Sequence, residues 1–351
     1  MKNTYHIGCV PGDGIGPEVV SISQTILDGV AAQEGFSLEW QIHNWGSDFY
    51  RRYGKMMPED GLEQLSDTDA IFFGAVGDPD ISDIDTLWGL LIPIRREFDQ
   101  YVNIRPAKYV PGLRTPLQNA EHVDLVIVRE NSEGEYSEVG GRFARGTQRE
   151  FAAQEAIFTR KGIERVAKYA AEVAFSRNSK VTSVTKSNGI IHSMSFWDEV
   201  IGEVASQYDE LAWRSVLVDA MAAELIISPQ EHDVVLCTNL FGDILSDLAS
   251  ATLGSLGIAA SANINPGGTA PSMFEPVHGS APDIAGKGVA NPFAQLSSGA
   301  MMLDHLGQQN AAHRINNALD MLVEDGLVTQ DLGGSLSSAE VRDALQEKLQ
   351  L

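Results

Sequence analysis

Short, continuously apolar runs recur along the chain and alternate with stretches in which apolar residues follow a helical period. Continuously apolar runs are typical of strands that are buried on both faces, as in parallel sheets. We therefore expect strands at Tyr5–Pro11, Ala70–Ala75, Leu125–Arg129, Lys180–Thr185, Ser215–Asp219 and Asp233–Thr238. The helical period predicts helices at Pro17–Glu34, Gly162–Arg177, Ser193–Tyr208 and Phe241–Gly254. This alternation favours an α/β fold with a largely parallel sheet.

Two segments lie outside the alternation. Residues Gly140–Thr159 have an extended pattern and are expected to form an interaction arm, whereas Ala294–Leu351 is expected to be mainly helical. A length of 351 residues is typical of two domains rather than one. Because no change in composition marks a linker, we expect the two domains to share the chain discontinuously.

Charge and hydropathy exclude several classes of partner. The chain has 25 basic and 48 acidic residues, a formal net charge of −23, which repels nucleic acid and anionic membrane surfaces. No run approaches the ~20 apolar residues that span a membrane, and the N-terminus lacks the apolar region of a signal peptide. Cys9 and Cys237 lie in apolar runs without paired spacing and are expected to be buried free thiols, with a disulfide as the alternative. A cytoplasmic protein is therefore expected.

The first glycine loop lies between an expected strand and an expected helix. It is similar to the dinucleotide-binding turn Gly-x-Gly-x-x-Gly, but after Gly12 and Gly14 the third glycine position holds Pro17. Asp13 would also place a carboxylate where a pyrophosphate has to approach. We interpret the loop as a tight turn with Pro17 opening a helix, and we expect any dinucleotide to bind elsewhere.

Asp243 and Asp247 are spaced so that a helix places both carboxylates on one face. Their neighbours Ile244, Leu245 and Leu248 are apolar, and two like charges in such surroundings repel unless a cation lies between them. Mg²⁺ takes one or two carboxylates together with substrate oxygens. The pair indicates a site for a divalent cation; the alternative is a solvated helix face with an aspartate cap at its N-terminus.

Three arginines supply the positive charge that an anionic substrate needs in so acidic a chain. Arg95 and Arg105 flank one short segment, and Arg129 ends an expected strand. Arginine side chains bind carboxylates through two parallel hydrogen bonds, so that several of them at one point would hold a dicarboxylate. The alternative for each residue is an ordinary surface arginine.

Lys186 follows an expected strand directly, and a lysine near other cations can have its pKa lowered enough to act as a base. The alternative is an ordinary surface lysine. Asp219 closes another expected strand, and Tyr136 ends the polar loop that follows Arg129.

Taken together, these segments resemble the metal-dependent β-decarboxylating dehydrogenases, a family that includes isopropylmalate, isocitrate, D-malate and tartrate dehydrogenases. The most specific motifs are Gly12–Val19, Arg95–Pro106, Val128–Tyr136, Thr185–Asn188, Asn239–Asp247 and Glu275–Ile284 with Asn291 and Pro292. Within the family, the D-malate and tartrate branch is favoured by Trp45–Asp48, Met56–Pro58, Gly74–Gly77 and Leu87–Gly89.

The resemblance implies a role for each candidate residue. The substrate carboxylates would be bound by Arg95, Arg105 and Arg129. The ligands of Mn²⁺ or Mg²⁺ would be Asp219, Asp243 and Asp247, with Lys186 as the base and Tyr136 as the acid. Lys186 and Asp219 would reach into the site of a second copy, which makes a homodimer necessary, and the resemblance also allows a role for K⁺. NAD would be bound by a loop that contains His278, Gly279, Ser280, Ala281, Asp283, Ile284 and Asn291.

The implied fold is the two-domain fold of isopropylmalate dehydrogenase, with a largely parallel central sheet, and not a Rossmann fold. Residues 1–98 with 252–351 would form the large, dinucleotide-binding domain. Residues 99–251 would form the small domain, which carries the dimer interface and the metal and substrate residues. NAD is favoured over NADP because Asp283 would accept hydrogen bonds from ribose hydroxyls and Ser280–Ala285 contains no Lys or Arg to hold a 2′-phosphate. His278 is expected near the adenine; the alternative is a loop histidine with satisfied hydrogen bonds.

The expected reaction is the oxidation of a small 2-hydroxy dicarboxylate, tartrate and/or D-malate, with decarboxylation of the β-keto acid for some substrates. The window Trp88–Ile92 is apolar and could accept an isopropyl group, but Trp88 could equally fill that space. Because an apolar pocket discriminates one methylene by only ~1–3 kcal/mol, we expect several substrates to react. The alternatives are 3-isopropylmalate dehydrogenase and, outside the enzymes, a dimeric metal- or dicarboxylate-binding protein.

Overall fold

The computed structural model describes residues 2–351, which divide into two compact units. Unit 1 comprises the described residues up to Gln100 together with Lys108–Glu121 and Ser250–Leu351. Unit 2 comprises Tyr101–Ala107 and His122–Ala249.

Residues 108–121 are the main difference from the expected domain boundaries, because they pack in unit 1 rather than with the middle of the chain. Gly112 lies in this segment with φ of +98°, and a Cβ built on it would lie 2.9 Å from the carbonyl oxygen of Val323. Only glycine allows so close an approach at this backbone angle. The contact ties the segment to the C-terminal helices of unit 1.

Unit 1 has a sheet with the strand order β2-β1-β3-β12-β11. Neighbouring strands are parallel except for the antiparallel pair β11 and β12. The strands are β1 (Thr4–Gly12), β2 (Ser37–Ile42), β3 (Ala70–Ala75), β11 (Ala260–Ile264) and β12 (Ser272–Pro276). The helices are α1 (Gly16–Glu34), α2 (Ser47–Tyr53), α3 (Gly61–Ser66), α4 (Asp83–Thr86), α5 (Ile92–Glu97), α10 (Phe293–His305), α11 (Gln309–Glu324) and α12 (Ser338–Leu349).

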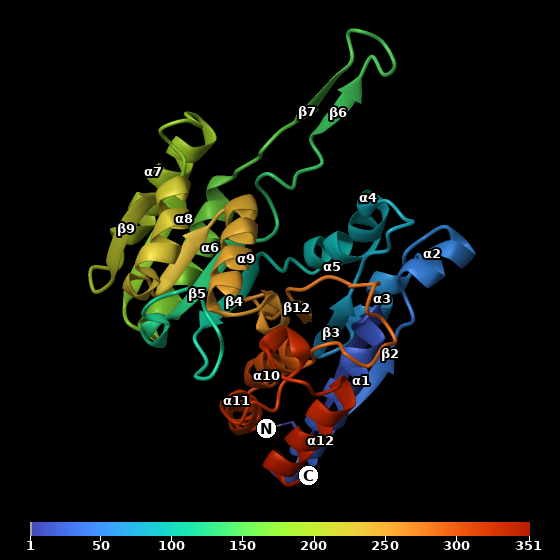
Figure 1. The fold of residues 1–351 in the computed structure, drawn as a ribbon. Coiled ribbons are helices and arrows are strands. Elements are labelled where there is room, and N and C mark those ends of the chain that lie inside the picture. Colours follow the sequence, from blue (N-terminus) through green and yellow to red (C-terminus); the bar gives the residue numbers. More distant parts are fainter. Residues whose placement is uncertain (1) are drawn as a thin grey trace. The chain divides into compact units, whose positions relative to one another are not determined.

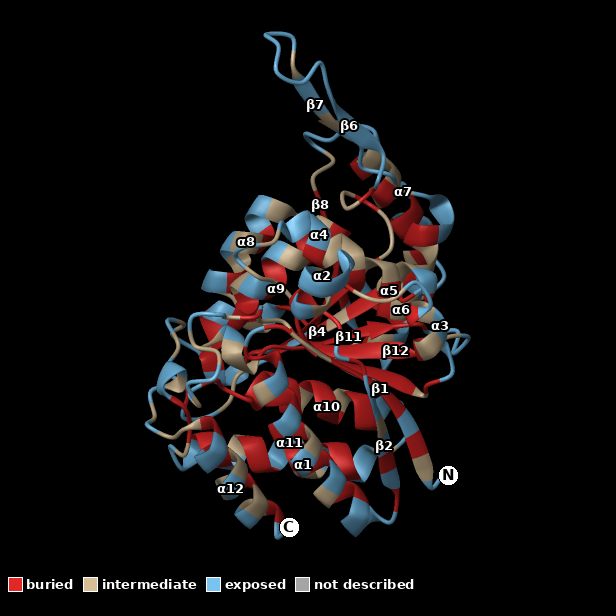
Figure 2. Cartoon of the chain, turned by 90° about the vertical axis from the view of Figure 1, so that its right-hand side faces the viewer, coloured by how far each residue is buried: buried red, intermediate tan, exposed pale blue. Residues whose placement is uncertain are grey.

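The core of unit 1 lies between this sheet and its helices. Strands β3 and β12 are buried along their whole length. Helices α1 and α10 pack on the strands, and α11 and α12 pack on these helices in turn (Figure 2). Pro17 fixes the first turn of α1, and Gly35 ends the helix in a left-handed conformation with φ of +82°, as glycine commonly does.

Unit 2 has a parallel ladder in the order β5-β10-β8-β9, with β4 beside β5. Its strands are β4 (Val102–Lys108), β5 (Asp124–Glu130), β6 (Gly140–Phe143), β7 (Phe151–Gln154), β8 (Lys180–Thr185), β9 (Ala212–Leu217) and β10 (Val234–Cys237). Its helices are α6 (Arg160–Phe175), α7 (Ser193–Ala205), α8 (Val218–Ile227) and α9 (Asn239–Leu253), whose last turn belongs to unit 1. Strands β6 and β7 form a separate antiparallel hairpin that extends away from the ladder (Figure 1).

Most of the expected elements are confirmed. Ala70–Ala75 and Lys180–Thr185 form strands with the expected ends, and the four expected helices are α1, α6, α7 and α9. The C-terminal part is helical, and the segment expected to be extended contains the exposed hairpin β6–β7. The strand expected at Ser215–Asp219 is displaced: β9 ends at Leu217, and Asp219 lies in the first turn of α8.

Two further sequence predictions can be compared with the structure. Cys9 and Cys237 are buried free thiols, as expected, and burial raises the pKa of Cys9 to about 12. Within residues 2–351, no helix combines the length and the apolarity that crossing a membrane requires.

Candidate functional site

Helix α9 carries the acidic pair and begins directly after the buried strand β10. Thr238 precedes the helix as its N-cap. Its hydroxyl accepts a hydrogen bond from the backbone N–H of Phe241, and this bond is long, at 3.4 Å. Asp243 and Asp247 then share one helix face, as their spacing predicts. Of their apolar neighbours Leu245 is buried, whereas Ile244 is 56% exposed.

Arg105 and Arg129 both reach Asp243. Nη1 of Arg105 lies 3.2 Å from the Asp243 carboxylate and 3.5 Å from that of Asp247, and it donates to Oγ of Ser246 at 2.7 Å. Nη1 of Arg129 pairs with Asp243, and its Nη2 donates to Oδ1 of Asn239 at 2.7 Å. Two of the three expected arginines therefore converge on the acidic helix face.

The predicted acid, Tyr136, lies at the same carboxylate. Its hydroxyl donates to Oδ2 of Asp243 at 3.0 Å, and the guanidinium carbon of Arg129 lies 5.6 Å from the centre of its ring. Arg129 is 3% exposed and Arg105 8% exposed, so both cations act in surroundings with little water. With little water to screen it, the Coulomb attraction between a buried cation and a carboxylate is stronger than at the surface.

The electrostatics of the acidic pair have opposing contributions. Burial raises the pKa of Asp247, Arg105 lowers it and the nearby Asp243 raises it, with burial the largest cause. The positive charges of Arg105 and Arg129 offset the negative charges of the two carboxylates. The face is only partly solvated, because Asp243 pairs with the buried Arg105 and Arg129 whereas the side chain of Asp247 is 55% exposed.

Lys186 and Asp219 form a separate pair within unit 2. Lys186 follows β8 directly, and its Nζ lies 2.6 Å from Oδ1 of Asp219. The hydrogen bond from Lys186 is the chief cause that lowers the pKa of Asp219. Asp219 is exposed and does not join Asp243 and Asp247: within residues 2–351 no group of three or more His, Cys, Asp or Glu side chains could hold a metal ion.

Arg95 belongs to unit 1 and lies on helix α5 rather than beside a strand. Its Nη2 donates to Oε1 of Glu275 at 2.7 Å, and Nδ2 of Asn263 donates to the same oxygen at 2.6 Å. Nε of Arg95 is buried and has no hydrogen-bond partner among the described residues. A buried donor of this kind is costly unless a ligand satisfies it.

The first glycine loop has a structural role in unit 1. Oδ1 and Oδ2 of Asp13 accept hydrogen bonds from the backbone N–H and the hydroxyl of Ser47, both at 2.7 Å, and Oδ2 accepts a third from the N–H of Gly77 at 3.0 Å. A Cβ at Gly14 would lie 1.9 Å from the carbonyl oxygen of Ser280, so this position requires glycine. The loop supports the segment around Ser280 instead of cradling a phosphate, in agreement with the rejected Rossmann turn.

The expected cofactor segment follows β12. Burial lowers the pKa of His278, and its Nε2 is buried without a hydrogen-bond partner among the described residues. Ala281 has φ of +39°, a backbone angle that is uncommon outside glycine and occurs often at functional loops. Asp283 is exposed, and Ile284 packs against the buried Ile15 and Val19 with its neighbours.

Asn291 holds the end of this segment in place. Its Nδ2 donates to Asp331 at 2.9 Å, and its Oδ1 accepts from the N–H of Phe293 at 3.0 Å, at the start of α10. Both polar atoms of the side chain are thus used inside unit 1. Gly279 is exposed and Ser280 is buried; the carbonyl oxygen of Ser280 accepts from the N–H of Ile15 at 2.8 Å.

The donor sets fit the groups that the sequence predicts. Two carboxylates one helical turn apart suit a hard cation such as Mg²⁺ or Mn²⁺. A neutral imidazole with a buried unpartnered nitrogen suits a ligand that offers a hydrogen-bond donor or acceptor, as a dinucleotide does.

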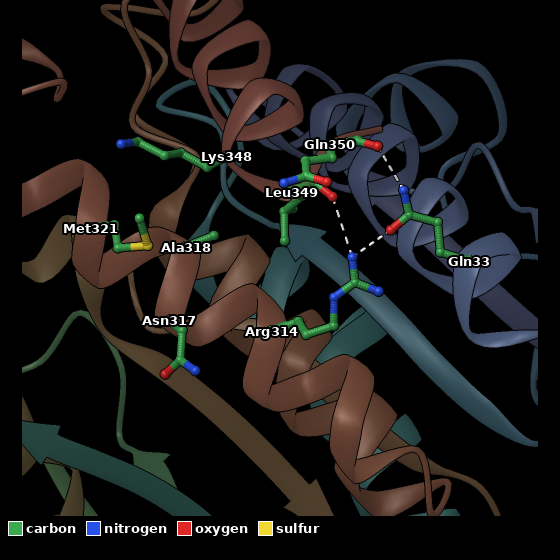
Figure 3. A pocket seen from close by; sticks show the side chains of 8 residues that line it. All are labelled: Gln33, Arg314, Asn317, Ala318, Met321, Lys348, Leu349 and Gln350. Carbon is green, nitrogen blue, oxygen red and sulfur yellow. Dashed lines mark hydrogen bonds between the residues drawn. The ribbon is translucent and has the colours of Figure 1, made fainter.

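A surface pocket of about 500 Å³ lies at the C-terminal end of unit 1 and is lined by none of the residues predicted to form the site (Figure 3). Arg314 donates to Glu34 at 2.7 Å and to the carbonyl oxygen of Leu349 at 3.2 Å, and it also bonds Gln33. Lys348, the other cation of the pocket, pairs with Asp325 at 2.6 Å. These charges fasten α12 to α1 and α11, so the pocket has a structural explanation.

Sequence reasoning missed two residues that hold the acidic site together. Asn239 accepts from Arg129 and donates to the carbonyl oxygen of Glu133 at 3.2 Å, and the carboxylate of Glu135 bonds the first turn of α9. The only signal in the sequence was that both lie in motifs already singled out.

Comparison with known proteins shows which family the chain belongs to. Residues 6–346 match the family model described as isocitrate/isopropylmalate dehydrogenase. The chain is 49% identical over 347 residues to a probable tartrate dehydrogenase/decarboxylase of Bacillus subtilis, with 98% of each chain covered. It is 48% identical to the decarboxylating D-malate dehydrogenase of Escherichia coli, with 98% of each covered, and 48% identical to the tartrate dehydrogenase/decarboxylase of Pseudomonas putida, with 99% and 98% covered.

A solved structure agrees with the sequence matches. The isocitrate dehydrogenase of Methylococcus capsulatus superposes with a TM-score of 0.91 at 35% identity, over 99% of this chain and all of that one. The chain belongs to the isocitrate/isopropylmalate dehydrogenase family. The predicted family and fold class are therefore confirmed.

Proposed function

We propose that the protein is a metal-dependent, NAD-linked dehydrogenase that oxidises tartrate and/or D-malate and decarboxylates the β-keto acid formed from some substrates. The observation that carries the proposal is the meeting of Arg105, Arg129 and Tyr136 at Asp243. In this group the two arginines could bind the carboxylates of a substrate, Asp243 could bind a metal ion, and the phenol of Tyr136 could deliver a proton. The names of the curated relatives support the choice of substrate.

Asp243 and Asp247 would hold Mn²⁺ or Mg²⁺, with Asp219 of a second copy as a third ligand. This arrangement explains why one chain alone brings no three suitable side chains together within residues 2–351. The exposed apolar side chains of Ile226 and Ile227 on α8, at 55% and 78% exposure, support a homodimer because they leave an apolar surface uncovered.

In the proposed reaction, the bound ion would stabilise negative charge on the substrate oxygen, and bound NAD would accept the hydride. Lys186, freed from its pair with Asp219, would take the proton of the C2 hydroxyl. The arginines, including Arg95 with its unpartnered Nε, would bind the substrate carboxylates and fix their orientation. After CO₂ leaves the β-keto acid, Tyr136 would protonate the enolate carbon or relay a proton to it, so that D-malate yields pyruvate.

Unit 1 supports a small polar substrate over 3-isopropylmalate. Leu90 and Leu91, at 0% and 8% exposure, are part of the hydrophobic core and offer no free apolar wall. The ring of Trp88 is stacked with Arg96, whose guanidinium carbon lies 4.8 Å from the ring centre. This window forms a π-helix, Leu87–Leu91, an element that is common at functional sites.

NAD is proposed as the coenzyme, bound by His278, Gly279, Ser280, Ala281, Asp283, Ile284 and Asn291. The exposed carboxylate of Asp283 would accept hydrogen bonds from the ribose and repel a 2′-phosphate. The buried Nε2 of His278, which has no hydrogen-bond partner among the described residues, would face the adenine.

The experiment is NAD reduction with Mn²⁺ against D-malate, the chiral and meso tartrates and 3-isopropylmalate, with CO₂ measured in parallel. The proposal predicts turnover of D-malate and at least one tartrate, with 3-isopropylmalate poor. A clear preference for 3-isopropylmalate would contradict the proposed substrate and leave the family mechanism in place.

A further inference from the structure

The loop from Asn131 to Tyr136 contains two glutamates whose carboxylates point to different helices. Glu133 accepts hydrogen bonds from the backbone N–H and the hydroxyl of Thr159, at 2.8 and 2.9 Å, where α6 begins. Glu135 accepts from the hydroxyl of Thr238 at 3.0 Å and from the backbone N–H of Leu240 at 3.2 Å, where α9 begins. The two side chains make the same kind of bond at two different helix starts.

Glu135 completes the N-cap of α9 from outside the helix. The backbone N–H groups of a first helical turn have no partner within the helix, and a carboxylate there is also favoured by the helix dipole. Thr238 caps Phe241 only at 3.4 Å, so the bond from Leu240 to Glu135 is the shorter of the two. The hydroxyl proton of Thr238 points to the same carboxylate and fixes the rotamer of the cap.

These bonds determine where the acidic pair lies relative to the phenol. Tyr136 is the next residue after Glu135, and Asp243 lies one turn into the helix that Glu135 caps. The hydrogen bond from Tyr136 to Asp243, at 3.0 Å, therefore spans two segments that Glu135 fastens together. Asn239 adds a second tie, from Arg129 to the carbonyl oxygen of Glu133.

We infer that Glu135 is a positioning residue: by capping α9 it sets the carboxylates of Asp243 and Asp247 against Tyr136 and Arg129. The inference rests on the proposed function for its catalytic consequence, but its geometric part concerns the cation site alone. Substitution of a residue that orients metal ligands typically lowers metal affinity or activity by roughly 10–100-fold.

The test compares Glu135→Ala, Glu135→Gln and the matched control Glu133→Ala in the full-length protein. The carboxylate of Glu133 makes two bonds at the start of α6, so its loss should destabilise the fold to a similar extent. Glu133→Ala keeps the backbone carbonyl oxygen to which Asn239 donates, so the tie to α9 remains. Each variant is measured by thermal unfolding, by titration with Mn²⁺ alone and by steady-state kinetics.

For Glu135→Ala we expect Mn²⁺ affinity and kcat/KM to fall about tenfold or more. Glu133→Ala should keep both within about twofold at a similar loss of melting temperature. Glu135→Gln should recover most of the loss, because its amide oxygen can accept from Leu240 and its amide nitrogen can bond the hydroxyl of Thr238.

Equal losses in Glu135→Ala and Glu133→Ala would overturn the inference, since stability alone would then explain them. Unchanged Mn²⁺ affinity in Glu135→Ala would overturn it as well. If the parent protein binds Mn²⁺ but turns over neither tartrate nor D-malate, the proposed function fails while the titration still decides the role of Glu135.

Discussion

Gly242 gives the sharpest steric test of the site, because helix α9 packs there directly on Arg129. A Cβ at Gly242 would lie 2.6 Å from Cγ of Arg129 and 2.7 Å from its Cβ, whereas ordinary contacts begin at 3.4 Å. The helix and the arginine must therefore separate by about 0.8 Å in Gly242→Ala, the difference between 3.4 and 2.6 Å. The contacted atoms belong to the inner part of the side chain, which cannot swing away while the guanidinium keeps its bonds.

Two opposing effects set the change in stability. Overpacking of this kind costs ~1–3 kcal/mol, and replacing a helical glycine with alanine returns ~0.5–1 kcal/mol. The free energy of unfolding should therefore fall by up to about 2.5 kcal/mol. Because a displacement of ~1 Å at a binding group can cost ~10²-fold, kcat/KM for D-malate should fall at least about tenfold.

The matched control is Gly202→Ala on α7, where a Cβ meets nothing within 4 Å. It should stabilise the protein by about 0.5–1 kcal/mol and leave the kinetics unchanged. Denaturant unfolding and NADH formation measure both variants. Should Gly242→Ala keep kcat/KM within twofold of the parent, Arg129 would not be held in place by α9, and the reasoning would be refuted.

Three further perturbations have defined outcomes. Burial raises the pKa of Glu130 from 4.5 to about 7. The folded protein then binds more protons, so that its free energy of unfolding should fall by up to about 3 kcal/mol as the pH rises from about 4.5 to 7. Urea unfolding across that range should show this slope in the parent and not in Glu130→Gln; equal slopes would speak against it. Asp283→Ser should raise kcat/KM for NADP relative to NAD, with Lys287→Ala as a nearby control, and an unchanged ratio would assign coenzyme choice elsewhere. Trp88→Ala should improve turnover of 3-isopropylmalate relative to D-malate by opening space beside Arg96, and no change would remove Trp88 from substrate selection.

The sequence predicts best the elements whose signal is local. Ala70–Ala75 and Lys180–Thr185 have the expected ends because their strand patterns stop at those residues. The strand expected at Ser215–Asp219 is displaced because the apolar run continues through Val218 into α8, and Leu217 offers no side-chain cap to mark the start of that helix. Asp219 could not be assigned to a helix without that signal.

The candidate site divides in the same way. The i,i+4 spacing of Asp243 and Asp247 predicts their shared helix face from local sequence alone. The bond between Tyr136 and Asp243 joins residues 107 positions apart, so only the family resemblance could bring them together. Glu135 is a still harder case, because its bonds to the start of α9 depend on tertiary packing and its sequence context marks it only as part of a polar loop.

The most direct test of the central claim is the absorbance of NADH when the purified, EDTA-treated protein is given D-malate and NAD, first without and then with Mn²⁺. A metal-dependent dehydrogenase produces no NADH before the addition and a steady rise after it, and Lys186→Ala shows no rise in either case. If Mn²⁺ produces no rise with D-malate or with any tartrate, the chain has kept the fold of its family without the chemistry.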